Sequence, residues 1–411
     1  MNNEHAYSMR QINRKEITRS LNVLREYQLA DAPCTSLRDI IAFSAGEILG
    51  KREDKTLIGS YKRRWAFWAI YQFSPEQKKR GVICSSAGNH AQWFAHACKL
   101  LGVHGTVFMP KTAQPFKVQR VREFGGKFVR IVQEWDDFFA TQKAAQDFQR
   151  KNKAVFIHPF DNRNVIIGQS TVTAEILEDR GDVWTIIYPV GWGGLLAGGI
   201  SARNAWGSDV RLVGVEPAGA PSMAHALSVG SNEPLPYSVN GFVDGAAVKQ
   251  VGKRPFHIVQ QNEVPIHPVP EGRIAQTMVD FSNRAGDIVE PAGALAAASV
   301  AWDIIPWLRG KVVAIVSGRC FTLNQMPSVV DRAEKFSGRK ITFIVQLPER
   351  PRALQVFLSK MPAQVNMTNI IHPPKTSDTQ PVEISYEGDP SVIQRVVAAL
   401  KKTGFAYQIQ Q

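Results

Sequence analysis

The sequence has few cysteines and no long apolar run, and both absences narrow the class of protein. Its four cysteines, Cys34, Cys84, Cys98 and Cys320, fall in no CxxC or other metal-ligand spacing. So few thiols in 411 residues exclude a disulfide framework, and we predict reduced thiols and no metal site. No apolar run approaches the roughly 20 residues that span a bilayer, and the first residues lack a signal-peptide pattern. We therefore expect a cytoplasmic protein with no membrane segment.

The basic residues are not concentrated in any one stretch. The net charge is +13, but no aromatic-interleaved basic stripe, zinc finger or RNP-like motif accompanies it. A basic surface equally suits the attraction of an anionic cofactor or substrate. We predict no nucleic-acid partner, and a gel shift at physiological salt would test this, since such binding depends steeply on salt.

Short β-branched runs alternate with longer helical patterns from about residue 81 onward. The expected strands are 82–84, 106–109, 128–132 and 185–190, each followed by a helical pattern. Such alternation indicates βαβ units and a mainly parallel sheet covered on both faces. The apolar run 312–316 stops at Ser317-Gly318, as expected of a buried central strand that ends at a ligand crevice. We predict an α/β architecture.

The pattern changes after Gly338. Strands are expected at 341–347, 364–371, 382–386 and 406–409, with helices at 353–359 and 391–401. This βαββαβ order over roughly 70 residues is that of a ferredoxin-like unit. We predict that residues 336–411 form a separate α+β domain, distinct from the α/β region 1–335.

Three loops rich in glycine or small polar residues stand at expected strand-to-helix junctions: Ser86-Ala87-Gly88-Asn89-His90, Gly191-Trp192-Gly193-Gly194-Leu195 and Ser317-Gly318. A glycine-rich turn that opens a helix presents free backbone N–H groups and the positive end of the helix dipole. The second loop is therefore the best phosphate candidate. By itself it fits a tight turn equally well, because Leu196 stands where a dinucleotide fingerprint has its third glycine.

The ordered motifs of this chain resemble those of the threonine dehydratases, enzymes of the pyridoxal 5'-phosphate fold type II. The matching segments run in order over nearly the whole chain: Lys51-Arg52-Glu53-Asp54, Ser60-Tyr61-Lys62, Ser86 to Gln92, Phe124-Gly125-Gly126, His158-Pro159-Phe160-Asp161, the Gly191 loop, Gly214-Val215-Glu216-Pro217, Asp244-Gly245, Glu290 to Leu295 and Ser317-Gly318. The resemblance implies two lobes with parallel-rich sheets, the smaller lobe spanning roughly 55–155.

The resemblance also implies a role for individual residues. Lys62 would carry pyridoxal 5'-phosphate as a Schiff base, Asn89 would bind the ring 3'-hydroxyl, and Ser317 would face the ring nitrogen. The phosphate would be held by the loop Gly191, Trp192, Gly193, Gly194 and Leu195. The substrate carboxylate would be held by the loop Ser86, Ala87, Gly88, Asn89 and His90, in which His90 alternatively only packs.

The implied reaction is deamination of L-threonine, and of L-serine, by β-elimination. For threonine it yields 2-oxobutanoate and ammonia, the first step of isoleucine biosynthesis, with Lys62 as both anchor and base. The C-terminal unit resembles the ACT-like regulatory domain of biosynthetic threonine dehydratases, which binds isoleucine and sometimes valine. Members of the family commonly form tetramers or dimers, so the resemblance implies a homo-oligomer.

Several bulky or polar residues stand where the family pattern has glycine: Trp65, Trp93, Ser170, Trp192, Arg319 and Arg352. Because glycine serves where a Cβ would clash or φ must be positive, each replacement is expected to cost on the order of 1–3 kcal/mol or some ligand binding. Cys320 likewise replaces a usual asparagine. A catalytically impaired relative is therefore one alternative, and a serine dehydratase-type lyase is another. Ala87 disfavours racemisation, because racemases place a serine there as second base.

Overall fold

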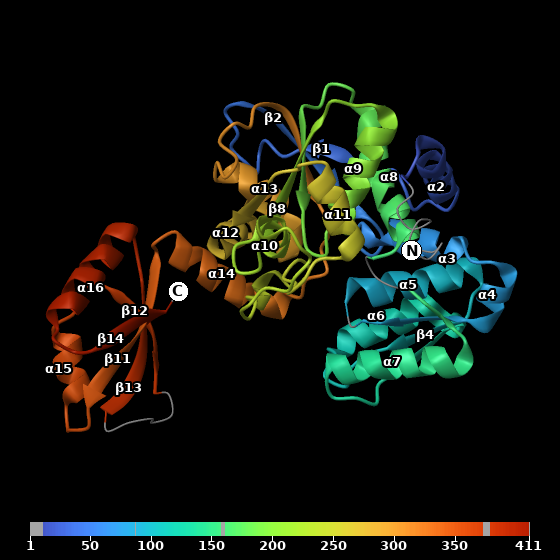
Figure 1. Ribbon diagram of the computed structural model, residues 1–411. Helices are drawn as coiled ribbons and strands as arrows, with labels where there is room; N and C mark the ends of the chain where they lie inside the picture. The colour runs from blue at the N-terminus through green and yellow to red at the C-terminus, as the bar shows by residue number, and fades with distance from the viewer. Residues whose placement is uncertain (1–10, 87, 158–160, 373–378, 411) are drawn as a thin grey trace. The chain divides into compact units, whose positions relative to one another are not determined.

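The computed structural model describes residues 11–86, 88–157, 161–372 and 379–410. Its contacts divide the chain into two compact units, coloured from blue to orange and from orange to red in Figure 1. The first comprises Met1–Pro270 and Phe281–Phe321, and the second comprises Glu271–Asp280 and Thr322–Gln411. Within the described ranges, no helix is both long and apolar enough to cross a membrane. The same ranges hold no group of three or more His, Cys, Asp or Glu side chains suited to a metal ion.

A six-stranded sheet forms the larger part of the first unit. Its strands, in spatial order, are β1 (Cys34–Ser36), β2 (Gly46–Arg52), β10 (Gly310–Val316), β7 (Thr185–Pro189), β8 (Arg211–Pro217) and β9 (Ile266–Val269). All neighbours are parallel except β1 and β2. The predicted central strand is confirmed, because β10 lies between β2 and β7 and is buried from Val312 onward.

Helices pack against this sheet and against one another. The helices of the first unit outside the smaller sheet are α2 (Arg14–Glu26), α3 (Lys62–Tyr71), α8 (Arg163–Asp179), α9 (Gly194–Trp206), α10 (Ser222–Val229), α11 (Lys253–Gln261) and α13 (Pro291–Ala301). A Cβ on Gly198 would lie 2.7 Å from the Ser170 nitrogen, and one on Gly199 would lie 2.5 Å from the Tyr188 ring. These glycines let α9 pack closely against both α8 and the sheet.

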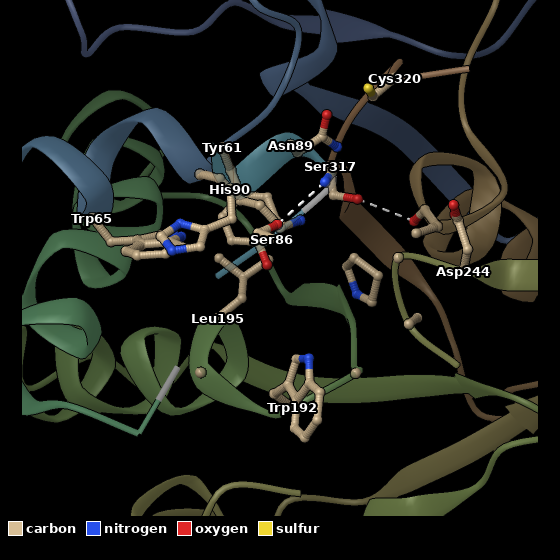
Figure 2. A pocket seen from close by; sticks show the side chains of 18 of the residues that line it. Tyr61, Trp65, Ser86, Asn89, His90, Trp192, Leu195, Asp244, Ser317 and Cys320 are labelled. Atoms are coloured by element: carbon tan, nitrogen blue, oxygen red, sulfur yellow. Dashed lines mark hydrogen bonds between the residues drawn. The ribbon is translucent and has the colours of Figure 1, made fainter. Parts of the chain in front are cut away.

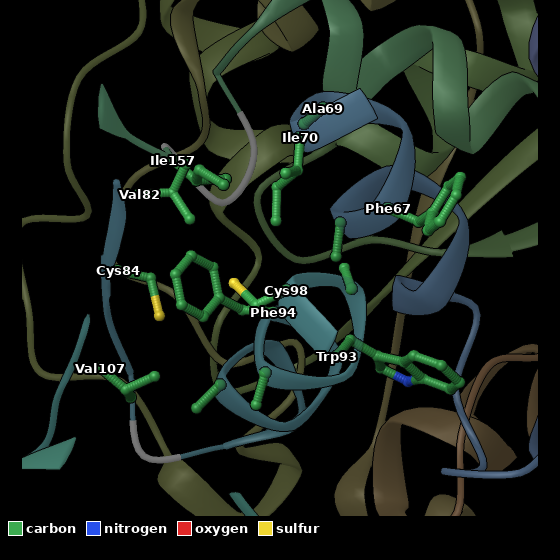
Figure 3. Packing of buried hydrophobic residues seen from close by; sticks show 14 of the residues in the cluster. Phe67, Ala69, Ile70, Val82, Cys84, Trp93, Phe94, Cys98, Val107 and Ile157 are labelled. Carbon is green, nitrogen blue, oxygen red and sulfur yellow. The ribbon is translucent and has the colours of Figure 1, made fainter. Parts of the chain in front are cut away.

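A smaller parallel sheet is built from the segment between residues 82 and 156. Its strand order is β5 (Val129–Val132), β4 (Gly105–Phe108), β3 (Val82–Ser85) and β6 (Val155–Phe156), and its helices are α4 (Pro75–Arg80), α5 (Asn89–Leu101), α6 (Pro115–Gly125) and α7 (Phe138–Asn152). In Figure 3 the α5 residues Phe94 and Cys98 pack against Val82 and Cys84 of β3. Burying a side chain as large as Phe94 contributes about 1.5–3 kcal/mol, and this core holds the N-terminus of α5 at the end of β3.

The second unit is an antiparallel sheet with helices, as the βαββαβ pattern predicts. Its elements in chain order are α14 (Met326–Phe336), β11 (Lys340–Pro348), α15 (Ala353–Ser359), β12 (Asn366–Ile371), β13 (Thr379–Glu387), α16 (Pro390–Lys402) and β14 (Tyr407–Gln410). The first residues of α12 (Glu271–Ala285) also belong to this unit. The strand order β12-β13-β11-β14 is the ferredoxin-like arrangement. Phe343, Phe357 and Leu400 are fully buried in its core.

Candidate active site

The first unit contains a cavity of about 310 Å³ at the carboxyl ends of β3, β7 and β10, the place where parallel sheets bind ligands. Figure 2 shows its lining side chains. It brings together the predicted site residues Lys62, Ser86, Gly88, Asn89, His90, Gly191, Trp192, Gly193, Gly194, Leu195 and Ser317. Ala87 lies outside the described residues. The individual roles implied by the resemblance stay predictions, although one cavity collects the residues that were assigned them.

Lys62 is the first residue of α3, and its amine faces negatively polarised groups. Its Nζ lies 4.5 Å from the centroid of the Tyr61 ring. Burial by itself lowers the pKa of Lys62, but Tyr61, Glu290 and Asp244 together outweigh that effect, and the pKa lies above its ordinary value. The cavity is thus lined by two lysines, Lys62 and Lys117, and by the carboxylates of Glu290 and Asp244, which favour the protonated form of the free Lys62 amine.

Asn89 stands at the first position of α5 and contacts the carboxylate of Glu290. Its Nδ2 donates to Glu290 at 3.0 Å and 3.4 Å, while its buried Oδ1 has no hydrogen-bond partner. Glu290 also accepts the backbone N–H of Cys320 at 3.1 Å. A buried amide with an unsatisfied oxygen costs free energy unless a ligand completes its hydrogen bonds. Asn89 is therefore well placed to meet a polar group in the cavity.

The N-terminus of α9 supplies a cradle for an anion. Gly193, with φ of +87°, precedes Gly194 at the first position of this helix. No acceptor in the described part of the chain takes the backbone N–H groups of Gly193, Gly194 or Leu195. Aligned free N–H groups and the positive end of the helix dipole bind phosphate. The buried Oε1 of Gln169, without a partner, lines the same cradle.

Trp192 does not close this cradle. Its side chain is 41% exposed, and in Figure 2 the indole lies on the far side of the loop from Asn89 and Ser317. Its backbone carbonyl accepts the N–H of Gly252 at 3.0 Å, which fixes the loop. The sequence predicted that a tryptophan at a family glycine position would cost ligand binding. The placement of this indole does not support that expectation for the phosphate.

This arrangement predicts opposite results for two neighbouring substitutions. A Cβ at Gly193 would lie 2.6 Å from Met223 Cε and 2.9 Å from Pro255 Cβ, in a left-handed backbone conformation. Gly193→Ala should therefore weaken pyridoxal phosphate binding about tenfold or more, because strain of about 1–3 kcal/mol enters the cradle. Trp192→Ala should change the dissociation constant less than about threefold. Titration of each protein with the cofactor, followed by absorbance, measures both; a weaker Trp192 variant would contradict the outward placement.

The two other tryptophans at family glycine positions are buried, and Trp65 also lines the cavity. Trp65 and Trp93 are each 1% exposed. The Trp65 ring stacks on His90 with centroids 4.7 Å apart and planes 26° apart, while Trp93 meets His96 edge-on. The stacking of Trp65 adds packing of about 0.5–1.5 kcal/mol and fixes the imidazole of His90 at the end of the 86–90 loop. The structure thus gives His90 a packing contact in the wall of the cavity.

Ser317 ends β10 and is 2% exposed. Its hydroxyl donates to the Ala292 carbonyl at 3.1 Å, as the dashed line from Ser317 in Figure 2 shows. Its oxygen keeps lone pairs for a second partner. Cys320, three residues on, accepts a contact from Gln92 Nε2 at 3.4 Å, and burial followed by Glu290 raises the pKa of its thiol. Cys320 is therefore a protonated thiol in the wall of the cavity.

The assignment of roles from the sequence omitted Tyr61, Glu290 and Asp244, which all line the cavity. Each stands inside a motif that carried the resemblance, namely Ser60-Tyr61-Lys62, Asp244-Gly245 and Glu290-Pro291. Two of these residues could have been noticed in the sequence, because Asp244 precedes a glycine and Glu290 precedes a proline that starts a helix. Because 201 residues separate Asn89 from Glu290, their contact was not visible from spacing.

The residues of the cavity fit pyridoxal phosphate. The free N–H groups before α9 suit its phosphate, the unsatisfied Asn89 amide suits its ring hydroxyl, and the Ser317 hydroxyl suits its ring nitrogen. Lys62 and Lys117 both line the same cavity, and Lys62 is the one that opens α3 within the motif Ser60-Tyr61-Lys62. The chemistry of the donor set therefore matches each polar part of that cofactor.

Comparison with known proteins supports the same cofactor. Residues 26–318 match the family model described as pyridoxal-phosphate dependent enzyme. The biosynthetic L-threonine dehydratase of Halalkalibacterium halodurans is 35% identical over 366 residues, which cover 87% of each chain. The enzyme of that name from Bacillus subtilis is 38% identical over 315 residues, covering 76% of this chain and 74% of its own.

Solved structures show the same similarity. The processed threonine deaminase isoform 2 of Solanum lycopersicum superposes with a TM-score of 0.71 at 30% identity, covering 79% of this chain and 90% of its own. Maize serine racemase superposes with a TM-score of 0.70 at 27% identity, covering 78% and 97%. The chain therefore belongs to the pyridoxal-phosphate dependent enzymes, within the family of the biosynthetic threonine dehydratases.

Proposed function

We propose that this protein is a threonine ammonia-lyase, a carbon–nitrogen lyase that converts L-threonine to 2-oxobutanoate and ammonia in the first step of isoleucine biosynthesis. L-serine is proposed as a second substrate. The observation that carries the proposal is that one cavity joins Lys62 to the phosphate cradle of α9. The relatives named biosynthetic threonine dehydratase support the choice of substrate.

Lys62 has two tasks in the proposed reaction. Its Nζ would hold the cofactor covalently, and as a free amine the same Nζ would take the proton from Cα of the substrate. Pyridoxal phosphate supplies the electron sink that accepts the negative charge formed at Cα. Because Lys62 opens α3 and is anchored by the buried residues that follow it, its amine stays within reach of the cofactor and of Cα.

The N-terminus of α5 is proposed to bind the substrate carboxylate. The loop Ser86 to His90 leads into this helix, which begins at Asn89, so first-turn N–H groups and the helix dipole face the cavity. The Gly88 N–H donates to Ser86 Oγ at 3.2 Å, which stabilises the turn. A carboxylate bound here orients Cα toward Lys62.

The test is an assay for 2-oxo acids with the full-length protein loaded with pyridoxal phosphate, supplied with L-threonine or L-serine. We expect 2-oxobutanoate from threonine and pyruvate from serine, with the higher kcat/KM for threonine. A protein that binds the cofactor but releases no oxo acid would be the catalytically impaired relative. A higher kcat/KM for serine would identify a serine dehydratase-type lyase.

We further propose that residues 336–411 are an ACT-like regulatory domain which binds isoleucine or valine, and that 1–335, with a smaller lobe at roughly 55–155, form the catalytic region. A cavity of about 350 Å³ in the second unit supports an effector site, since it offers Arg350 and Arg352 for a carboxylate and Leu347 and Val382 for an aliphatic side chain. Added isoleucine in the same assay should change the rate. We also propose that the protein is a cytoplasmic homo-oligomer, either a tetramer or a dimer.

A further inference from the structure

Glu290 is a buried carboxylate in the wall of the cavity for which the proposed reaction has no use. It is 3% exposed and caps the N-terminus of α13. Its backbone N–H donates to the Gly318 carbonyl at 3.1 Å, and its own carbonyl accepts from Gly293 at 2.8 Å and Ala294 at 3.1 Å. The backbone of Glu290 is thus pinned between the end of β10 and the start of α13.

The side chain of Glu290 joins two segments that carry predicted cofactor contacts. One is the start of α5, where Asn89 Nδ2 donates to it at 3.0 Å. The other is the loop after β10, where the Cys320 N–H donates to it at 3.1 Å, three residues beyond Ser317. A Cβ on Gly318 would lie 2.4 Å from Glu290 Oε1, so the carboxylate lies directly on this loop.

The carboxylate of Glu290 is buried among charged and polar groups that change its pKa. Burial raises its pKa and Asp244 adds to this, while Lys62, the Asn89 amide and the Cys320 N–H oppose it. Tyr61, Cys320, His90 and Lys117 are further titratable side chains that line this cavity. A carboxylate buried without hydrogen bonds and a cation would be strongly destabilising. Its partners here are the groups expected to contact the cofactor.

We infer that Glu290 is a positioning residue, which holds in place the two groups expected to contact the polar atoms of the cofactor ring, namely the Asn89 amide and the Ser317 hydroxyl. The Nδ2 of Asn89 donates to Glu290, which leaves the Oδ1, without a partner in the structure, to meet the ring hydroxyl. The Cys320 contact fixes the loop that presents Ser317 to the ring nitrogen. The negative charge of Glu290 also stabilises the protonated state of the nitrogen at Lys62. This inference rests on the proposed function, because it assumes that the cavity holds pyridoxal phosphate.

The test compares Glu290→Ala and Glu290→Gln with the wild type, and uses Glu216→Gln as a matched control. Glu216 is also fully buried in the first unit and accepts two backbone N–H groups, from Met223 at 2.7 Å and Ala224 at 3.0 Å, but it does not line the cavity. Three quantities are measured on full-length protein: the dissociation constant of pyridoxal phosphate, the pH midpoint of the visible absorbance of the bound cofactor, and the urea midpoint of unfolding.

Glu290→Ala should weaken cofactor binding about tenfold, since two hydrogen bonds that hold the contact residues are lost. Glu290→Gln keeps an acceptor and should bind within about threefold of wild type, yet move the pH midpoint down by about one unit because the charge is lost. Glu216→Gln should leave both cofactor quantities unchanged. If both Glu290 variants keep the wild-type affinity and pH midpoint, and only the urea midpoint falls, the inference is wrong. A wild type that binds the cofactor without forming oxo acid would overturn the proposed function alone.

Discussion

Replacing Lys62 with alanine is expected to abolish the visible absorbance of the bound cofactor and to lower kcat by about a thousandfold or more. The substitution removes both the covalent anchor and the base, and a positioned base alone contributes about 10²–10⁴-fold. Pyridoxal phosphate should still bind, at reduced affinity, because the cradle of Gly193, Gly194 and Leu195 is untouched. Absorbance of the purified protein and an oxo-acid assay at saturating threonine measure the two effects.

Lys143→Ala provides the control for this substitution. Lys143 is an exposed lysine on α7, so its loss removes a charge of the same kind without touching the cavity. Its variant should keep the colour and the kcat of the wild type. A Lys62→Ala protein that keeps both the visible absorbance and the turnover would show that another amine carries the cofactor, and the assignment of Lys62 would fail.

Local features of the site could be predicted from the sequence, because each depends on a short segment. The loop before α9 was recognised as a phosphate candidate from its glycines, and the structure places Gly193 at a positive φ before the helix. The C-terminal βαββαβ order followed from the hydrophobic periodicity alone, and the sheet has the matching strand order. The fold and the cofactor are confirmed by the family and the solved relatives.

Features that depend on contacts between distant segments could not be predicted. Whether Trp65 and Trp93 block the site depends on the space beside them, and the structure buries both rings against histidines. The strand β2, parallel to β10 across more than 250 residues of chain, was not anticipated, nor were β8 and β9. The contact between Glu290 and Asn89 belongs to the same class, because only the fold brings two helix N-termini to one cavity.

Contacts between distant segments also bury five charged side chains together near the start of α3, the helix that begins with Lys62. Arg64 contacts Glu53 at 2.6 Å and also pairs with Glu175, and Lys51 contacts Glu175 at 2.7 Å. These four side chains are at most 1% exposed, and Arg63 reaches Glu53 at 3.5 Å. Together they join β2, α3 and α8, so the helix that presents Lys62 is held by ion pairs as well as by apolar packing.

Arg64→Met is expected to destabilise the first unit by about 3–5 kcal/mol. The methionine fills much of the volume but leaves Glu53 and Glu175 short of a cation, and breaking a buried pair from one side costs this amount. Urea denaturation followed by intrinsic tryptophan fluorescence measures the loss. Arg150→Met is the matched control, because Arg150 pairs with Asp147 at a surface where the two side chains are 74% and 53% exposed; its effect should stay below about 0.5 kcal/mol.

The same network predicts the pH dependence of the wild type. Burial by itself raises the pKa of Glu175, but Arg64 and then Lys51 lower it to about 2, below the ordinary value of 4.5. Because the folded pKa is the lower one, the stabilisation is complete above pH 4.5 and is lost as the pH falls toward 2. Arg64→Met should therefore flatten the fall of the urea midpoint between pH 4.5 and the lowest pH at which the protein stays folded. An equally steep fall in the variant would show that other carboxylates govern acid unfolding.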